Sequence, residues 1–492
     1  MSVSIRDWFQ GKDVLVTGGT GFIGKGLIEK LLRTTDINRI YLIIRSKKQF
    51  NAKERWQQLS NDLVFERLKS EKPEVLNKVV AVEGDIAEKG LGLSEEDKEE
   101  LCNNVAIIFH SAACVRFDDQ LSNALLLSVR GTKELLDLAK TMKKLECFQY
   151  VSTTYCNCNL NLEKIEEKIY HQDYDWKTLI KMAETNSQAL NILQYMILKS
   201  HPNTYTMCKS IAEMVLQETK ENLPVVIFRP AVVVGSVKEP EPGWADNFNG
   251  PVGVTTGVSS GVLRVFRGDS SSYLDYCAID YVINAMIITA WLARNKCTEE
   301  IDVYNCAFAD KIKVTFGDLV KNGVTVNHEV PLNNNIWYPF LILVKNTYIY
   351  HFLFYILQFL PGLFIDILLI IFRKEPILTK LNVKVYLAGS ALLYFTSRTI
   401  AFDNTKFRSI YNLVPECDRE IFYLEEDPNL TSLDYMLIFQ RGVKKYLLNE
   451  KESDLDKLID KHWRLYYIDR ATKVFLCAVL IWFLVNKIIL FF

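Results

Sequence analysis

Short runs of apolar residues alternate with amphipathic stretches through the first half of the chain. The apolar runs lie at residues 13–16, 39–44, 79–82, 105–109, 147–152 and 224–228. Between them, stretches such as 25–33 and 131–143 repeat apolar residues at helical spacing. Short buried strands that alternate with amphipathic helices are typical of a parallel sheet covered by helices on both faces. The pattern therefore predicts an α/β fold with a doubly wound parallel sheet.

The pattern changes beyond residue 235. Proline, glycine and serine first become frequent, which indicates a loop-rich lobe on the substrate side. Residues 336–372 are then strongly apolar and aromatic, although Lys345, His351, Pro361 and Asp366 interrupt them. The part from 346 to 365 is long enough to span a bilayer, but its proline and polar residues fit a membrane-dipping or tunnel-lining hairpin equally well. Charged helical patterns return over residues 374–473.

The last 19 residues, 474–492, contain a single charge, Lys487. As a helix they would extend roughly 28 Å, close to the apolar thickness of a bilayer, and are expected to form a transmembrane helix. Cationic side chains immediately before this tail favour a cytosolic location for the part of the chain that precedes it. No apolar signal-peptide core is evident near the N-terminus. The expected domains are a doubly wound α/β domain with its loop-rich lobe (1–335), an apolar membrane-associated segment (336–373), a helical C-terminal domain (374–473) and the tail (474–492).

Composition excludes several classes of function. The 58 basic and 59 acidic side chains nearly cancel, and no basic stripe suggests nucleic acid as a partner. The eleven cysteines lack CxxC pairs and fit reduced intracellular thiols. The six histidines show no HxH or HExxH spacing, so no metal site is expected.

A glycine-rich turn follows the first apolar run and precedes a helical stretch. It comprises Thr17, Gly18, Gly19, Thr20, Gly21, Phe22, Ile23 and Gly24. A turn without Cβ atoms lets backbone N–H groups and a helix N-terminus approach a pyrophosphate. A glycine turn can also be purely structural, but its place between a strand and a helix predicts a Rossmann-like dinucleotide site.

Residues after the next strands indicate which dinucleotide binds. Arg45, Lys47 and Lys48 follow the second strand where an acidic residue would select NAD, which favours NADPH over the alternative of a solvated basic turn. Asp85 and Ile86 follow the third strand, where Asp85 can accept from the adenine amine or simply cap a turn. The cofactor is also expected to pass close to Ser111 and Ala112, which follow the fourth strand.

Tyr205 and Lys209 are four residues apart and hence share one face of a helix. A nearby ammonium is expected to lower the phenol pKa, which suits a general acid for carbonyl reduction. Ser152, Thr153 and Thr154 end the fifth strand, where one hydroxyl can polarise the carbonyl; Thr153 is preferred and Ser152 is second. Arg229 and Pro230, which follow the sixth apolar run, are expected to border the cofactor.

These motifs together resemble the extended short-chain dehydrogenase/reductases, and more closely the insect-type alcohol-forming fatty acyl-CoA reductases. The resemblance rests on TGGTGFIG at 17–24, YVSTTYCN at 150–157, YTMCK at 205–209, FRPAVVVGSVKEPEPGWADNFNGP at 228–251 and YFTSRTIAFDN at 394–404. It covers nearly the whole chain.

The resemblance implies that long-chain acyl-CoA is reduced through an aldehyde to a primary alcohol by two NADPH, with release of CoA. Tyr205 would donate the proton, Lys209 would orient the nicotinamide ribose, and Thr153 or Ser152 would polarise the carbonyl. The apolar tail predicts a membrane protein, and because no peroxisomal tripeptide is evident, the endoplasmic reticulum is the expected location. Two alternatives remain: a sterol or 3β-hydroxy dehydrogenase of the same superfamily, and a non-catalytic NADP-binding scaffold.

Overall fold

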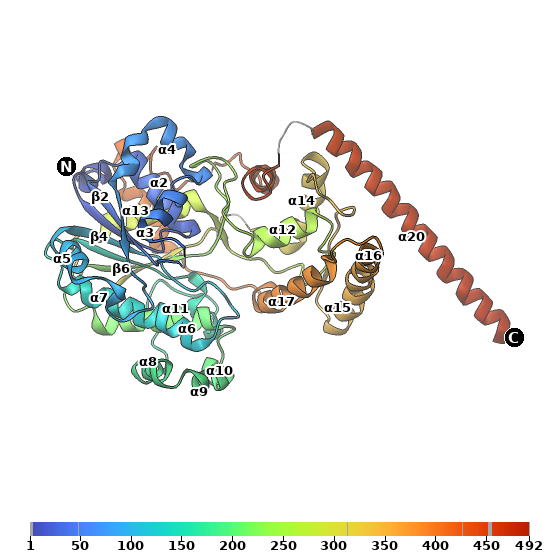
Figure 1. Cartoon of the computed structure of the whole chain (residues 1–492), viewed down its shortest axis with the longest axis horizontal. Helices are drawn as coiled ribbons and strands as arrows, with labels where there is room; N and C mark the ends of the chain where they lie inside the picture. Colours follow the sequence, from blue (N-terminus) through green and yellow to red (C-terminus); the bar gives the residue numbers. More distant parts are fainter. Residues whose placement is uncertain (1–2, 48, 312, 426, 451–454, 492) are drawn as a thin grey trace. The chain divides into compact units, whose positions relative to one another are not determined.

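A seven-stranded sheet, parallel throughout, forms the central layer of the N-terminal part (Figure 1). The computed structural model describes residues 3–47, 49–311, 313–425, 427–450 and 455–491. In order across the sheet the strands are β10 (Asp302–Cys306), β6 (Val225–Pro230), β5 (Cys147–Val151), β4 (Val105–His110), β1 (Asp13–Thr17), β2 (Arg39–Ile44) and β3 (Val79–Glu83).

The strand order confirms the predicted doubly wound sheet. From β1 the chain proceeds outward through β2 to β3, then returns to β4 on the other side of β1 and proceeds through β5 and β6 to β10. The direction of winding therefore reverses between β1 and β4, and ligands bind beyond the carboxyl ends of strands at such a point. The apolar runs predicted six of these strands. The seventh, β10, was not predicted because Asp302 and Asn305 interrupt its apolar pattern.

Helices cover both faces of the sheet (Figure 1). Helices α2 (Phe22–Thr34) and α13 (Ile279–Ala293) lie on one face, where the Gln149 side chain of β5 donates to the Met286 carbonyl of α13 at 2.8 Å. Helices α5 (Glu95–Asn104), α7 (Gly131–Lys140) and α11 (Thr204–Thr219) lie on the other face. Their apolar residues, including Leu101, Leu136 and Leu216, join the strands in one buried core.

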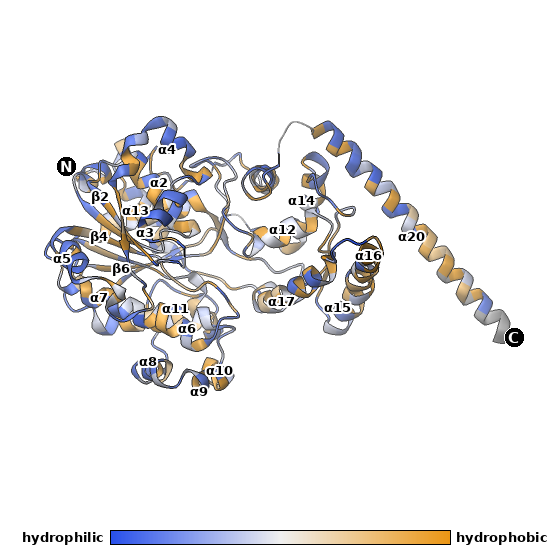
Figure 2. Ribbon diagram, viewed as in Figure 1, coloured by the Kyte–Doolittle hydropathy of each residue, from blue (hydrophilic) through white to orange (hydrophobic). Residues whose placement is uncertain are grey.

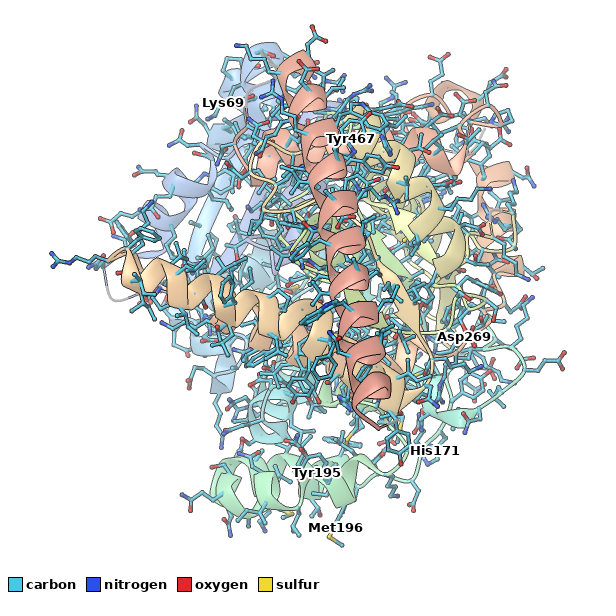
Figure 3. All side chains as sticks on the ribbon, turned by 90° about the vertical axis from the view of Figure 1, so that its right-hand side faces the viewer. Lys69, His171, Tyr195, Met196, Asp269 and Tyr467 are labelled. Atoms are coloured by element: carbon cyan, nitrogen blue, oxygen red, sulfur yellow. The ribbon has the colours of Figure 1, made fainter. Side chains whose placement is uncertain are left out.

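Smaller elements complete this part of the chain. They are α1 (Ile5–Phe9), α3 (Ala52–Leu59), η1 (Leu63–Phe65), α4 (Glu66–Glu71), η2 (Pro73–Lys78), η3 (Lys89–Gly92), α6 (Leu121–Leu125), η4 (Leu126–Arg130), η5 (Thr154–Leu160), α8 (Trp176–Thr185), α9 (Ser187–Ile192), α10 (Gln194–Leu198), β7 (Val232–Val234), β9 (Tyr276–Ala278), α18 (Thr405–Ser409), η7 (Ile410–Leu413) and η8 (Glu416–Asp418). The Tyr195 and Met196 side chains of α10 are strongly exposed (Figure 3).

The chain forms two compact units whose segments interleave. The first comprises Met1–Ala245, Leu274–Lys313 and Thr399–Pro428, and the second comprises Asp246–Tyr273, Val314–Arg398 and Asn429–Phe492. The contiguous domains expected from the sequence, with boundaries at 335 and 373, do not coincide with these units. The segment 399–428 belongs to the first unit because Asp418 accepts the Ile5 N–H at 2.7 Å and Asn305 donates to the Asp403 carbonyl at 2.7 Å.

The second unit is mostly helical. Its elements are α12 (Pro251–Ser259), β8 (Val265–Arg267), α14 (Phe316–Glu329), β11 (Ile342–Val344), α15 (Thr347–Phe354), η6 (Tyr355–Phe359), α16 (Leu360–Ile371), α17 (Leu378–Thr396), α19 (Ser432–Gly442), η9 (Val443–Leu447) and α20 (Leu455–Phe491). Strands β8 and β11 pair in parallel as a separate small sheet.

Two apolar helical segments of this unit bear on the membrane predictions. Among the described residues, one helical run is long and apolar enough to cross a bilayer: Thr347–Ile371, with 25 residues and a mean hydropathy of 2.2. Residues 474–491 of the predicted tail continue α20 as one helix, residue 492 lies outside the described residues, and Figure 2 shows the hydrophobic residues along the C-terminal half of α20. The side chains of Val474, Phe475 and Trp482 are exposed there.

Candidate active site

The carboxyl ends of β1, β4 and β5 bring the predicted site segments to one edge of the sheet. The glycine turn follows β1, Ser111 and Ala112 follow β4, and Ser152 and Thr153 follow β5. These strands are neighbours in the sheet, so their following segments lie at a common edge.

The glycine turn is packed too closely for side chains at two positions. Gly18 has φ +71°, and a Cβ there would lie 2.7 Å from the Ala112 nitrogen. A Cβ on Gly24 would lie 2.4 Å from the Gly18 carbonyl oxygen. Gly21 caps α2 without any side-chain acceptor for the first N–H groups of the helix. Those groups and the helix dipole are suited to an anion, so the cradle fits a dinucleotide pyrophosphate.

Only part of the predicted motif is accessible. Thr20, Gly21, Phe22 and Ile23 retain exposed surface, as does Gly18, whereas Thr17, Gly19 and Gly24 are buried. The buried members shape the turn.

A buried hydrogen-bond chain supports the turn from below. The Thr17 hydroxyl is 2.7 Å from His110 Nδ1, and His110 Nε2 is 2.9 Å from the Thr132 hydroxyl. Burial lowers the pKa of His110 to about 3, so the ring is neutral at physiological pH. The Ser111 hydroxyl donates to the Thr17 carbonyl at 2.7 Å, which ties the end of β4 to the turn.

Arg45 and Asp85, two of the residues predicted to contact the adenosine part of the cofactor, lie close together. Arg45 Nη1 is 3.6 Å from Asp85 Oδ2, and both side chains have exposed surface. Asp85 also accepts the Ala87 N–H at 2.9 Å, which is the turn role considered as its alternative. Ile86 is buried against Gly131, Lys47 is exposed, and Lys48 lies outside the described residues.

The structure brings Thr153, rather than Ser152, to Tyr205. The Thr153 hydroxyl hydrogen-bonds the Tyr205 side chain, whereas the buried Ser152 hydroxyl has no hydrogen-bond partner among the described residues. Thr153 also N-caps η5 by accepting the Tyr155 N–H at 3.3 Å. Tyr205 lies in the first turn of α11. Asn203 caps the N-terminus of this helix, because its side chain accepts the Thr206 N–H at 2.9 Å.

Lys209 is buried one turn beyond Tyr205. Its Nζ donates to the Val151 carbonyl and lies 4.5 Å from the centre of the Tyr150 ring. Burial lowers the pKa of Lys209 to about 7, although Glu213, one turn further along α11, favours the charged form.

The expectation that Lys209 lowers the pKa of Tyr205 is wrong in this structure. Burial raises the pKa of Tyr205 to about 12, and only the hydrogen bond with Thr153 opposes this rise. Lys209 has little effect because its own pKa lies near neutrality and its Nζ is bound to Val151. Tyr205 therefore keeps its proton at physiological pH, as a proton donor must.

The Arg229 side chain is engaged in structural contacts. Its guanidinium pairs with Glu213 at 2.6 Å and donates to the Lys168 carbonyl at 2.8 Å, with both ionic side chains fully buried. This pair holds β6 against α11 and thereby fixes Tyr205 and Lys209. Of the predicted strand end, the Pro230 carbonyl reaches the site, where it accepts from the Thr153 hydroxyl at 3.5 Å.

Two aromatic residues at the site were missed by sequence reasoning. Phe117 stacks on Tyr205 with ring centroids 6.0 Å apart, and Trp244 packs on Phe22 of the glycine turn at 4.9 Å. Phe117 follows β4 at the carboxyl edge of the sheet, and this position was the available signal. Trp244 lies within the 228–251 signature, and the missing Cβ of Gly26 makes room beside it.

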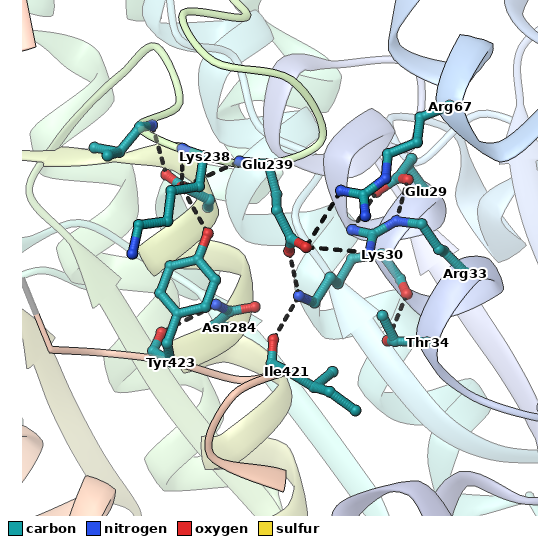
Figure 4. Close-up of polar contacts among 12 residues, drawn as sticks. Glu29, Lys30, Arg33, Thr34, Arg67, Lys238, Glu239, Asn284, Ile421 and Tyr423 are labelled. Carbon is teal, nitrogen blue, oxygen red and sulfur yellow. Dashed lines mark hydrogen bonds and ion pairs between the residues drawn. The ribbon is translucent and has the colours of Figure 1, made fainter. Parts of the chain in front are cut away.

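A buried ionic network anchors the same signature to α2 (Figure 4). Glu239 accepts from Lys30, from Arg33 at 3.1 Å and from Arg67 at 3.4 Å. Lys30 also donates to the Ile421 carbonyl at 2.6 Å. The network therefore ties the signature loop and the segment 399–428 to the helix that follows the glycine turn.

Comparison with known families gives two matches. Two family models, both described as male sterility protein, match this chain: an NAD-binding model over residues 16–286 and the Sterile model over residues 357–450. The first contains the glycine turn, Thr153, Tyr205 and Lys209.

Individual relatives match nearly the whole chain. Fatty acyl-CoA reductase wat of Drosophila melanogaster is 36% identical over 98% of this chain and 93% of its own length. Fatty acyl-CoA reductase 1 of Xenopus laevis and of Homo sapiens are each 34% identical over 92% of this chain and 88% of their own length. Among solved structures, the terminal R domain from the myxalamid PKS-NRPS pathway shares the fold, with a TM-score of 0.60 and 18% identity over 90% of this chain and 93% of its own.

Proposed function

Because the chain belongs to the fatty acyl-CoA reductase family, we propose that it reduces long-chain fatty acyl-CoA to a primary alcohol, with release of CoA. The observation that carries the proposal is the group formed by Thr153, Tyr205 and Lys209 at the sheet edge that also holds the glycine turn.

NADPH is the proposed cofactor, and when bound it supplies the hydride for each of the two reductions. Gly18, Gly21 and the first N–H groups of α2 would hold its pyrophosphate. The exposed Arg45 guanidinium would bind the 2′-phosphate, and Asp85 beside it would accept from the adenine amine. The 2′-phosphate contact favours NADPH over NADH.

Tyr205 is the proposed proton donor to the carbonyl oxygen. Its pKa of about 12 keeps the phenol protonated until negative charge develops on the substrate oxygen. The Thr153 hydroxyl orients the phenol and hydrogen-bonds the same oxygen. Lys209, held by the Val151 carbonyl, orients the nicotinamide ribose through its ammonium group.

The same residues serve both reductions. In the first, the thioester carbon gains a hydride and its oxygen gains the Tyr205 proton, which gives a hemithioacetal. Cleavage of its carbon–sulfur bond leaves an aldehyde and CoA thiol. Tyr205 then regains a proton from water. With a second NADPH bound, the aldehyde presents a carbonyl of the same kind to Thr153 and Tyr205, so the second reduction yields the alcohol without further catalytic groups.

We further propose that the chain is a membrane protein of the endoplasmic reticulum with its catalytic part in the cytosol. The support is the apolar C-terminal half of α20, with Arg470 and Lys473 just before it.

A turnover assay tests the proposed function. The full chain, purified in detergent, is given palmitoyl-CoA with either NADPH or NADH, and CoA, aldehyde and alcohol are quantified. We expect alcohol, one CoA and two oxidised NADPH per turnover, with much slower reaction with NADH. Nucleotide binding without turnover over a panel of acyl-CoAs would instead support the scaffold, and oxidation of a 3β-hydroxysterol would support the sterol dehydrogenase.

A further inference from the structure

The helical run from Thr347 to Ile371 has two distinct faces. One face is buried at every fourth position, by Tyr350, Phe354, Gln358, Gly362 and Asp366. The rest of the surface is largely exposed and apolar, and one row along it is formed by Ile349, Phe352, Ile356, Leu360, Leu363, Ile367 and Ile370. The π-turn η6 in the middle of the run reduces the drift of a four-residue repeat around an α-helix, and so keeps the buried face aligned. We call the exposed row of seven residues the apolar stripe.

Polar contacts tie the buried face to the rest of the second unit. The Gln358 side-chain oxygen accepts the backbone N–H groups of Arg264 and Val265, beside and within β8, at 3.0 and 3.2 Å. The Asp366 carboxylate accepts the N–H groups of Ile377 and Leu378, both at 3.0 Å, at the start of α17. Both acceptors are almost fully buried.

These contacts argue against a simple bilayer span. At about 1.5 Å per residue, the 25 residues are long enough to cross, so length does not decide the question. If the run crossed the bilayer in this fold, the strand β8 and the Arg264 guanidinium, which donates to the Leu357 carbonyl at 3.1 Å, would have to enter the hydrocarbon with it. Open sheet edges and charged groups are costly there.

Exposed cations lie next to the apolar stripe in sequence and structure. Arg373 and Lys374 follow α16, and Lys380 and Lys384 lie in the first half of α17. The one carboxylate within residues 373–384 is Glu375. Exposed apolar residues lie beside these cations: Phe372 precedes Arg373, and Ile377 and Val383 lie between Lys374 and Lys384. An apolar face bordered by cations is the composition that binds the surface of anionic membranes.

We propose that the apolar stripe and the cations of residues 373–384 dock in the plane of an anionic phospholipid bilayer, without crossing it. The stripe occupies the boundary between headgroups and acyl chains, and the four cations contact lipid phosphates or carboxylates. This contact is separate from the proposed reductase chemistry and from the α20 tail, and would hold for a chain with any catalytic activity.

Depth measurements in the full chain test the orientation. The exposed cysteines Cys297, Cys417 and Cys477 are replaced by serine, and an environment-sensitive fluorophore is placed on one new cysteine, at Ile349, Ile356, Leu363 or Ile370. Each protein is reconstituted with vesicles of phosphatidylcholine and phosphatidylserine that carry a quencher at a shallow or a deep position. Tyr195→Cys, also exposed and apolar but in α10, is the control, and the protein without a new cysteine gives the background.

We expect blue-shifted emission at all four stripe positions, with the shallow quencher more effective at each, and no shift at the control. Deep quenching at Ile356 and Leu363 with shallow quenching at Ile349 and Ile370 would show a span and overturn the proposal. Emission at the stripe that is unaffected by vesicles would also overturn it, because the stripe would then contact water or protein.

A charge-reversal pair tests the lipid preference. Lys380→Glu with Lys384→Glu should abolish the emission shift of the Ile356 probe in vesicles containing phosphatidylserine. The matched control, Lys177→Glu with Lys181→Glu, reverses two exposed charges on α8 and should leave the shift unchanged. An equal shift in both pairs would refute the role of the cations.

Discussion

The buried Tyr205 and Lys209 have pKa values shifted in opposite directions. Removal from water disfavours the charged form of each group, so the pKa of the phenol rises to about 12 while that of the amine falls to about 7. Both shifts have one cause, burial at the sheet edge. The consequence is a phenol that keeps its proton and a lysine whose charge changes within the physiological range.

The lowered pKa of Lys209 predicts that activity declines on the alkaline side of the pH profile. The ammonium is lost as pH rises through about 7, whereas an exposed lysine would keep it to about 10.5. We therefore expect kcat/KM to fall as pH rises above about 7. Lys209→Arg, which stays charged, should lower the overall rate but move this decline to higher pH. The measurement is a pH profile of both proteins with saturating NADPH, and a decline at the same pH in both would contradict the assignment.

The two hydroxyls at the end of β5 predict unequal effects of substitution. Thr153→Val removes the group that hydrogen-bonds Tyr205 and should reduce kcat by about 10²-fold, the usual effect of one positioned hydrogen-bond donor. Ser152→Ala removes a buried hydroxyl that has no hydrogen-bond partner among the described residues, and it should change kcat much less. A larger loss from Ser152→Ala, with cofactor affinity unchanged in both variants, would reverse the roles.

The backbone of the glycine turn must keep its position for the turn to hold the pyrophosphate. In Gly24→Ala the new Cβ would lie 2.4 Å from the Gly18 carbonyl oxygen and 2.5 Å from the Gly19 Cα, both rigid backbone atoms. We expect a loss of about 1–3 kcal/mol in the free energy of unfolding and at least tenfold weaker NADPH binding. Gly323→Ala, in α14 with open space around the position, is the control and should be neutral or stabilising. Thermal unfolding and fluorescence titration measure both effects, and normal binding by Gly24→Ala would show that the turn tolerates a side chain.

The central elements were predictable because they depend on local pattern. Strand β2 has the predicted bounds, 39–44, because five successive apolar residues, 40–44, are suited to a buried strand and the exposed Arg39 begins it. The partner of Tyr205 was less predictable. Thr153 is preferred over Ser152, but the sequence does not determine which of the three hydroxyls at 152–154 faces α11; the turn into η5 decides this. The rise in the pKa of Tyr205 depends on burial from elements distant in sequence, which spacing alone does not contain.

The helical run at 347–371 also depends on contacts that are distant in sequence. Its apolar composition was evident, but both a span and a hairpin fit that composition. The distinction lies in the contacts of Gln358 and Asp366 with residues 264–265 and 377–379, and no repeat in the sequence indicates those partners.

At the scale of the whole molecule, the chain returns twice to its first unit. Segments 274–313 and 399–428 supply α13, β10 and the partners of Ile5 and Lys30. Such returns cannot be predicted from local periodicity, because the contacts join residues about 400 positions apart. The contiguous domain boundaries expected from the sequence differ from the compact units for this reason.

The apolar tail of α20 is expected to make membrane binding of the whole protein resistant to salt. Its described side chains beyond Val474 are mostly exposed and apolar, so removal of residues 474–492 should leave the body folded. We expect the full chain to stay with membranes in high salt, and the truncated chain to be released by high salt, since surface docking depends on charge. Fractionation with and without a salt wash measures this. Salt-resistant pelleting of the truncated chain would place the main anchor elsewhere, with residues 336–372 as the first candidate.

The most direct test of the account is the product formed in cells with and without the proposed proton donor. The chain and its Tyr205→Phe variant are expressed in yeast, and extracted lipids are separated by gas chromatography, with Tyr195→Phe as a control on an exposed tyrosine. The account predicts new primary fatty alcohols from the original chain and the control, and a loss of about 10²-fold or more from Tyr205→Phe with NADPH binding retained. Alcohol formation by Tyr205→Phe at the original level would contradict the mechanism, and no alcohol from the well-expressed original chain would contradict the proposed function.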